Sequence, residues 1–107
     1  CSDIQTPHEL DNTYCVYHQY TVKIPNRDNI HKMLQEAGIG AMLYYPVPLH
    51  LQKVHAHLGW TKGMLPNTEK DTECVISLPM FPELTLEEQK TVASTLIECI
   101  EKSKALA

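Results

Sequence analysis

The sequence predicts an α+β domain in which helices pack on one face of a small, mostly antiparallel sheet of three strands. Segments with the two-residue periodicity of strands alternate along the chain with segments that have the periodicity of helices. A chain of 107 residues also fits one domain with one modest core. We expect residues 1–12 to be a polar lead-in and residues 13–107 to form that single domain.

Three segments have the composition of strands. Residues 13–24 are rich in β-branched and aromatic side chains, and one of their two alternating faces is expected to be buried. His18 shares that face with Tyr20 and is expected to be a buried histidine. Residues 41–45 are a short apolar run between glycine and proline, and residues 74–79 are a similar run that ends in proline.

Amphipathic helices are expected after the first strand and at the end of the chain. Asp28 is suited to cap the first helix, and Thr85 with Glu88 forms a capping box for the last. Brief helices are expected over residues 51–58 and 67–73. Apolar side chains recur at helical spacing behind both caps, namely Ile30, Met33, Leu34 and Ala37, then Val92, Ala93, Leu96, Cys99 and Ile100.

A stiff aromatic turn separates the second strand from the next helix. Its sequence "YYPVPLH" contains Pro46 and Pro48, which exclude a helix interior and a central strand. Tyr44 and Tyr45 offer flat apolar faces that end in hydroxyls. Such a turn loses little entropy when a ligand docks.

Charge and cysteine usage exclude several classes of protein. The net charge is −4 and the nine lysines and arginines are scattered, which disfavours nucleic acid and anionic membranes as partners. No apolar run approaches the roughly 20 residues of a membrane span. The cysteines form no C-x-x-C pair, so we expect buried or half-buried thiols in the reducing cytoplasm. They are Cys1, Cys15, Cys74 and Cys99.

No motif indicates catalysis by the chain itself. The glycine patterns of P-loops and Rossmann folds are missing, as is G-x-S-x-G. His50, His55, His57 and Cys74 lie at spacings that fit a zinc site poorly, so no metal is expected, although a metal-binding module stays open. The acidic side chains of Glu69, Asp71 and Glu73 are expected to form a solvated face.

Five motifs in order resemble the C-terminal part of the DegT/DnrJ/EryC1/StrS family, whose members are pyridoxal-phosphate-dependent aminotransferases acting on nucleotide-linked sugars. These motifs are "VYHQYTVKIPNRD", "LQEAGIG", "YYPVPLHLQ", "HLGW" and "SLPMFPELT", and the resemblance covers residues 8–100. It implies the small C-terminal domain of a fold type I enzyme, which closes one side of the active-site cleft. In that family a large N-terminal domain carries the cofactor and its Schiff-base lysine, and the enzymes are dimers.

The resemblance also implies roles for individual residues. Tyr44, Tyr45 and His50 are expected to bind substrate, and Asp28, Pro46, Pro48 and Thr85 to be structural. Many relatives have a histidine where Tyr44 stands. The tyrosine keeps a hydrogen-bonding hydroxyl and loses a group that titrates near neutrality.

None of the eight lysines lies in a segment that resembles the family's cofactor-lysine motif. We therefore expect pyridoxal phosphate in a parent enzyme, none bound to this chain alone, and no transamination by this chain alone. The expected partners are an N-terminal cofactor domain or second subunit and a nucleotide sugar. A detached, non-catalytic binding or assembly module is the alternative. Self-association is also expected, through an exposed patch of Tyr44, Val47, Leu49 and Trp60.

Overall fold

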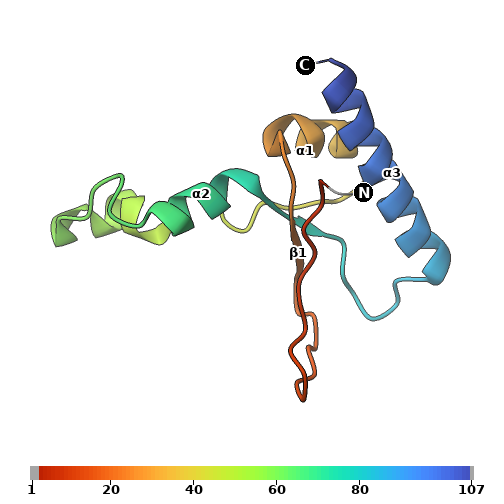
Figure 1. The fold of residues 1–107 in the computed structure, drawn as a ribbon, viewed down its shortest axis with the longest axis horizontal. Helices are drawn as coiled ribbons and strands as arrows, with labels where there is room; N and C mark the ends of the chain where they lie inside the picture. The colour runs from red at the N-terminus through yellow and green to blue at the C-terminus, as the bar shows by residue number, and fades with distance from the viewer. Residues whose placement is uncertain (1–2, 107) are drawn as a thin grey trace.

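The computed structural model describes residues 3–106 and forms an α+β fold, as predicted (Figure 1). Helix α2 runs directly into strand β2, without a loop between them. The elements of the described chain are β1 (Tyr20–Lys23), α1 (Arg27–Glu36), the 3-10 helices η1 (Leu49–Leu51) and η2 (Lys53–Leu58), α2 (Pro66–Cys74), β2 (Val75–Leu78) and α3 (Leu86–Ala105).

The sheet is an antiparallel ladder of β1 and β2, in which Val22 lies opposite Ile76. Two isolated bridges flank it. Gln5 pairs with Lys23 beside β1, and Met42 pairs with Ser77 beside β2. The bridge at Gln5 brings part of the expected lead-in against the body of the domain.

All three expected strands are shorter than predicted, and the sheet of the described residues has two strands rather than three. The third strand spans Val75–Leu78 rather than residues 74–79. Residues 13–19 form no strand, and His18 is exposed rather than buried. Residues 41–45 are reduced to the single bridge at Met42. β-branched and aromatic composition predicts a strand only where a neighbouring strand runs alongside, and β2 spans just four residues.

Helices α1 and α3 pack on the sheet and close one core. The opposed pair Val22 and Ile76 is fully buried against both helices. This confirms the helical spacing for most of the predicted apolar positions, but Ala37 and Ala93 are exposed. The helical members of the core are Ile30, Leu34, Leu96, Cys99 and Ile100.

The two predicted helix caps have different outcomes. Thr85 caps α3 in a complete capping box with Glu88, as predicted. The prediction that Asp28 caps α1 is wrong, because the cap residue is Asn26, whose φ is 50°. Asparagine tolerates this left-handed conformation better than most residues. Asp28 lies in the first turn of α1 instead and accepts a hydrogen bond of 2.7 Å from Nε of Arg27.

Arg27 fastens α1 to the sheet. Its side chain is buried, and one terminal guanidinium nitrogen donates a hydrogen bond of 2.8 Å to the carbonyl oxygen of Val75. On the other side of α1, the amide of Asn26 donates to the hydroxyl of Ser103 in α3 over 3.1 Å. The first helix is therefore held by polar contacts at its N-terminus as well as by its apolar face.

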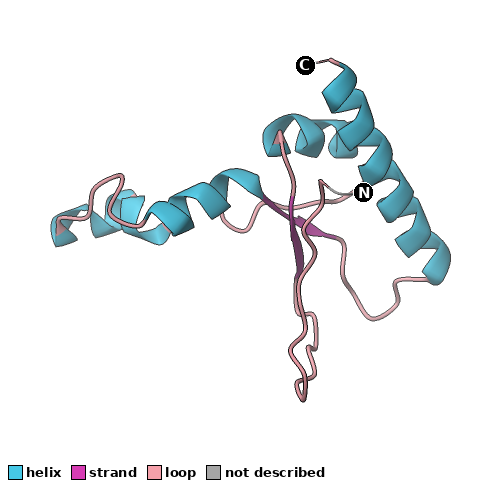
Figure 2. Cartoon of the chain, viewed as in Figure 1, coloured by secondary structure: helices cyan, strands magenta, loops and turns pink. Residues whose placement is uncertain are grey.

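Two segments project from this body (Figure 2). We call residues 6–19 the first arm and residues 44–65 the second arm. The radius of gyration is 15.7 Å, against roughly 13 Å for a compact domain of about 100 residues. The arms account for this expansion, since the body itself has a closed core.

The described cysteines have free thiols in three environments. Cys99 is buried and Cys74 half-buried, as expected, but Cys15 on the first arm is exposed. Burial raises the pKa of the Cys99 thiol. Cys1 lies outside the described residues. Within residues 3–106, no helix combines the length and apolar character needed to cross a membrane.

Truncating Ile30 tests the core. We expect Ile30→Ala to lower the free energy of unfolding by about 2–5 kcal/mol, because Ile30 is fully buried and the remaining cavity is not refilled. Urea unfolding followed by circular dichroism measures this. Leu86→Ala, at an exposed position of α3, is the control. Equal losses in both variants would contradict the assigned core.

The cap of α3 gives a second test. Thr85→Ala should cost about 1 kcal/mol of stability, because the backbone amide of Glu88 loses its hydrogen-bond acceptor. Thr91→Ala makes the same chemical change on the exposed surface of α3 and should not destabilise the domain. A loss of stability that is no larger at Thr85 than at Thr91 would show that the capping box contributes nothing.

Candidate functional site

The stiff turn begins where the chain leaves the sheet. Met42 exchanges backbone hydrogen bonds of 2.9 and 2.8 Å with Ser77 of β2, which fixes the start of the turn. The rings of Tyr44 and Tyr45 follow, with centroids 5.6 Å apart and planes inclined by 56°. Both side chains are exposed, so the turn presents two aromatic faces to solvent.

Tyr44 lines a hollow of about 310 Å³ at the end of the ladder where β2 finishes, which we call the tyrosine hollow. The first arm supplies His18 and Gln19, and the chain after β2 supplies Pro79 and Met80. An imidazole, an amide and a phenol therefore meet apolar side chains in one place. Such a surface can hydrogen-bond and stack against a polar ligand, and it holds no activated nucleophile.

The other two residues predicted to bind substrate lie elsewhere. Tyr45 lines a separate hollow of about 400 Å³ together with Val47 and Gln52. His50 lines a third, of about 440 Å³, with Trp60 and other side chains of the second arm. The structure therefore joins Tyr44 and Tyr45 through one turn, but it gives each of the three residues a different hollow.

His50 is buried inside the second arm. Its Nε2 lies 2.9 Å from Oε1 of Glu69, and the ring of Trp60 stands edge-on with its centroid 6.3 Å away. Its Nδ1 is buried without a hydrogen-bond partner among the described residues. The imidazole thus joins η1 to α2.

Glu69 holds the loop around this histidine. The prediction that its side chain belongs to a solvated acidic face is therefore wrong. Its carboxylate accepts hydrogen bonds from the amide of Gly63 at 2.8 and 2.9 Å, and its side chain is 12% exposed. The hydrogen bond with His50 is the main reason that the pKa of Glu69 is lowered, and the amides of Gly63 and Leu65 add to it against the opposing effect of burial. No local sequence pattern marks this pairing, which spans 19 residues.

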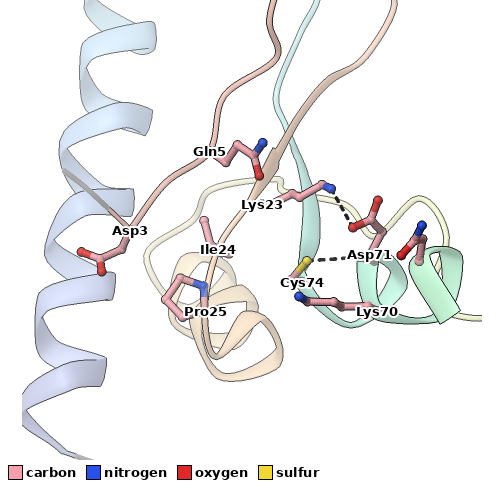
Figure 3. Close-up of a pocket in the computed structure, with 9 residues that line it drawn as sticks. Asp3, Gln5, Lys23, Ile24, Pro25, Lys70, Asp71 and Cys74 are labelled. Carbon is pink, nitrogen blue, oxygen red and sulfur yellow. Dashed lines mark hydrogen bonds and ion pairs between the residues drawn. The ribbon is translucent and has the colours of Figure 1, made fainter.

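Another hollow, of about 650 Å³, lies at the opposite end of the ladder (Figure 3). There Nζ of Lys23 lies 2.6 Å from Oδ1 of Asp71, and the two side chains point toward each other. The thiol of Cys74 donates to the carbonyl oxygen of Asp71 over 3.5 Å. Lys23 and Asp71 are paired with each other, and the hollow lies away from the aromatic turn, so its volume alone does not make it the candidate site.

The lysines do not fit pyridoxal phosphate. A Schiff base needs an amine that can lose its proton, whereas the hydrogen bond that Lys23 donates to Asp71 raises the pKa of Lys23. Every other lysine is exposed to solvent. No lysine of residues 3–106 therefore lies in a buried pocket.

Metal ligands do not gather either. Within residues 3–106, no three His, Cys, Asp or Glu side chains lie close enough together to hold an ion. Cys74 lies in the hollow beside Lys23, whereas His50 and His55 line a hollow of the second arm.

Solved aminotransferases contain the same arrangement of elements. The chain aligns with DesV of Streptomyces venezuelae, solved with a ketimine intermediate, at a TM-score of 0.87 and 32% identity, over 92% of this chain and 27% of that one. A DegT DnrJ EryC1 StrS aminotransferase from Brucella abortus aligns at a TM-score of 0.83 and 29% identity, over 92% and 26%. The fold is thus that of an α+β portion of a pyridoxal-phosphate aminotransferase.

The sequence is specific enough to give the family. Residues 2–97 match the DegT/DnrJ/EryC1/StrS aminotransferase family, and the chain belongs to it. A relative from Geobacillus stearothermophilus, named a pleiotropic regulatory protein, is 50% identical over 89% of this chain and 26% of its own length. A UDP-N-acetyl-3-dehydro-alpha-D-glucosamine 3-aminotransferase from Acidithiobacillus ferrooxidans is 38% identical over 88% and 25%. The chain spans about a quarter of the length of these relatives.

The pairing of Glu69 predicts a pH dependence of stability. Because the pKa of Glu69 is lower in the fold than its ordinary value of 4.5, its carboxylate stabilises the fold above that pH. The contribution is lost as the pH falls from about 4.5 through the folded value. Glu69→Gln should therefore be less stable than wild type at pH 7, and the gap should narrow toward pH 3.

Urea unfolding midpoints between pH 7 and pH 3 measure this gap. Glu73→Gln, an exposed glutamate on the same helix, is the control and should follow the wild-type curve. Parallel curves for wild type and Glu69→Gln would refute the role assigned to the carboxylate.

Proposed function

We propose that this chain is the small C-terminal domain of a pyridoxal-phosphate-dependent aminotransferase that acts on a nucleotide-linked keto-sugar. The observation that carries the proposal is the alignment of 92% of the chain with about one quarter of a solved DegT DnrJ EryC1 StrS aminotransferase. The domain supplies a wall of the cleft and contacts to its partner. Another part of the enzyme supplies the cofactor and the lysine that holds it.

Names of relatives support the substrate class. The Acidithiobacillus relative is named for a UDP-linked sugar, and a relative from Micromonospora megalomicea, 36% identical, is a dTDP-3-amino-3,4,6-trideoxy-alpha-D-glucose transaminase. Both names describe a nucleotide joined to a sugar that carries or receives an amine. The sugar is the shared part, and the tyrosine hollow offers side chains suited to it.

The tyrosine hollow would position the sugar rather than react with it. The hydroxyl of Tyr44 and the side chains of His18 and Gln19 can donate to or accept from sugar hydroxyls, while Met80 covers an apolar edge. The prolines of the turn keep the Tyr44 backbone stiff, so little entropy is lost on binding. Positioning of this kind supports chemistry that a cofactor performs elsewhere in the cleft.

The expected partner is the N-terminal cofactor domain or a second subunit. The exposed side chains of Tyr44, Val47, Leu49 and Trp60 form surface that such a partner would cover. Free thiols at the described cysteines support a cytoplasmic enzyme.

A second candidate is a non-catalytic binding or assembly module. The 50% identical relative bears the name of a regulatory protein, which favours this candidate. The two functions differ in whether the domain can complete an active enzyme.

A chimera distinguishes them. Residues 3–106 replace the matching quarter of the Streptomyces venezuelae aminotransferase, and turnover of nucleotide sugars is measured. We expect the chimera to bind pyridoxal phosphate and to transaminate, since the replacement completes the cleft. A folded, cofactor-loaded chimera without turnover would favour the binding module.

Within an active chimera, Tyr44→Phe should weaken kcat/KM about three- to tenfold, the effect of losing one hydrogen bond. Tyr14→Phe removes a hydroxyl from the exposed tip of the first arm and should leave kcat/KM unchanged. Equal effects of the two substitutions would remove Tyr44 from the substrate site.

The 107-residue chain gives a complementary test. Mixed with an equimolar amount of pyridoxal phosphate and treated with borohydride, it should show no single stoichiometrically labelled lysine by mass spectrometry. The reason is that its lysines are exposed or, at Lys23, paired with Asp71. One lysine labelled in the folded chain and not in urea would contradict the proposal.

A further inference from the structure

One residue next to the tyrosine hollow has an unfavourable backbone conformation. Tyr17 has a φ of 46°, which lies in the left-handed region. Bulky L-residues rarely adopt this region, because their Cβ comes too close to the following carbonyl oxygen. Such a conformation persists only where the surrounding structure holds it, and it is often found at functional sites.

Contacts on both sides of Tyr17 hold this conformation. Its ring lies against the ring of Tyr20, with centroids 5.3 Å apart and planes inclined by 44°. Tyr20 is itself fixed, since it pairs with Leu78 in the ladder and packs against the core. Ahead of Tyr17, the carboxylate of Glu9 accepts a hydrogen bond of 2.8 Å from the amide of Cys15. The first arm is therefore anchored just before Tyr17 and again at its ring.

The left-handed residue decides where the next two side chains point. Along a regular strand, His18 and Gln19 would face opposite ways, because successive side chains alternate. The chain bends at both residues instead, immediately before β1 begins. As a result, His18 and Gln19 both line the tyrosine hollow.

We propose that Tyr17 is a positioning residue of the tyrosine hollow. Its ring, seated on Tyr20, holds the backbone that turns His18 and Gln19 to one side. Tyr17 is not among the residues that line the hollow, so it acts through these two neighbours. The inference rests on the proposed function for the ligand, a sugar, and on the geometry of the first arm for the role of Tyr17.

Two adjacent polar side chains on one face suit a sugar ring. The imidazole of His18 and the carboxamide of Gln19 can both donate and accept hydrogen bonds, and hydroxyls on neighbouring ring carbons need such groups close together. A site built on hydrogen bonds rejects a ligand that leaves them unpaired more strongly than an apolar site does. Tyr17 therefore sets how tightly and how selectively the sugar is held, and it takes no part in making or breaking bonds.

Nuclear magnetic resonance of the 107-residue chain tests the geometry. The measurement is the set of nuclear Overhauser contacts that His18 and Gln19 make with Tyr44 and Met80, which line the same hollow. We expect these contacts in the wild type and in Tyr17→Phe, which keeps the ring. Tyr17→Ala removes the ring, so the backbone should leave the left-handed region and the contacts of His18, Gln19 or both should be lost.

Tyr14→Ala is the matched control. It removes the same side chain from the same arm, but Tyr14 is 88% exposed and is not among the residues that line the hollow. The contacts of His18 and Gln19 should be unchanged in this variant. Circular dichroism verifies that each variant is folded.

Kinetics of the active chimera test the consequence for binding. Tyr17→Ala should raise KM for the nucleotide sugar at least about fivefold and change kcat less than about twofold, because it weakens ground state and transition state alike. Tyr17→Phe and Tyr14→Ala should both leave KM within about twofold of the unsubstituted chimera. A merely structural role would lower the active fraction, and hence kcat, without changing KM.

Three results would overturn the proposal. They are a wild-type chain in which His18 and Gln19 make no contacts across the hollow, a Tyr17→Ala chain that keeps these contacts, and an active chimera in which Tyr17→Ala lowers kcat at unchanged KM. A chimera without turnover would count against the proposed function instead. The contacts in the 107-residue chain would still decide whether Tyr17 positions its neighbours.

Discussion

The four-residue ladder of β1 and β2 is the constraint on which the rest of the structure depends. At one end, Leu78 and the residues that follow it meet His18 and Tyr44 in the tyrosine hollow. At the other end, Lys23 meets Asp71 in the polar hollow. The buried pair Val22 and Ile76 between them anchors α1 and α3. A shift of the ladder by one residue would move the side chains that line both hollows and the core to the opposite face of the sheet, because side chains alternate along a strand.

A core this small covers the body but not the arms. Its side chains come from β1, β2, α1 and α3, together with Ile24 and Ala41, and the buried set includes no large apolar side chain of the second arm. The second arm therefore relies on polar contacts, namely the pairing of His50 with Glu69 and the amides that Glu69 binds. A buried pair of this kind holds shape without burying much apolar area. Consequently the second arm is folded, yet its outer surface stays exposed to solvent.

Local signals predicted the helices, while contacts between distant residues escaped prediction. The capping box at Thr85 and the apolar stripe of α3 lie within a few turns of each other, so sequence spacing suffices. Residues 13–19 have strand composition but form no strand ladder, and no local pattern reveals that. The partners of His50 and Lys23 lie 19 and 48 residues away. Only the folded chain brings these paired side chains together.

For the aromatic turn, the resemblance to a family predicts more than the physical properties of its residues do. Proline stiffness and exposed rings mark a binding surface in any protein, and they name no ligand. The structure adds that Tyr44 and Tyr45 face different hollows, so one turn can touch two parts of a ligand or a ligand and a partner. In the function proposed here, the turn contributes position, while the cofactor and its lysine belong to another part of the enzyme.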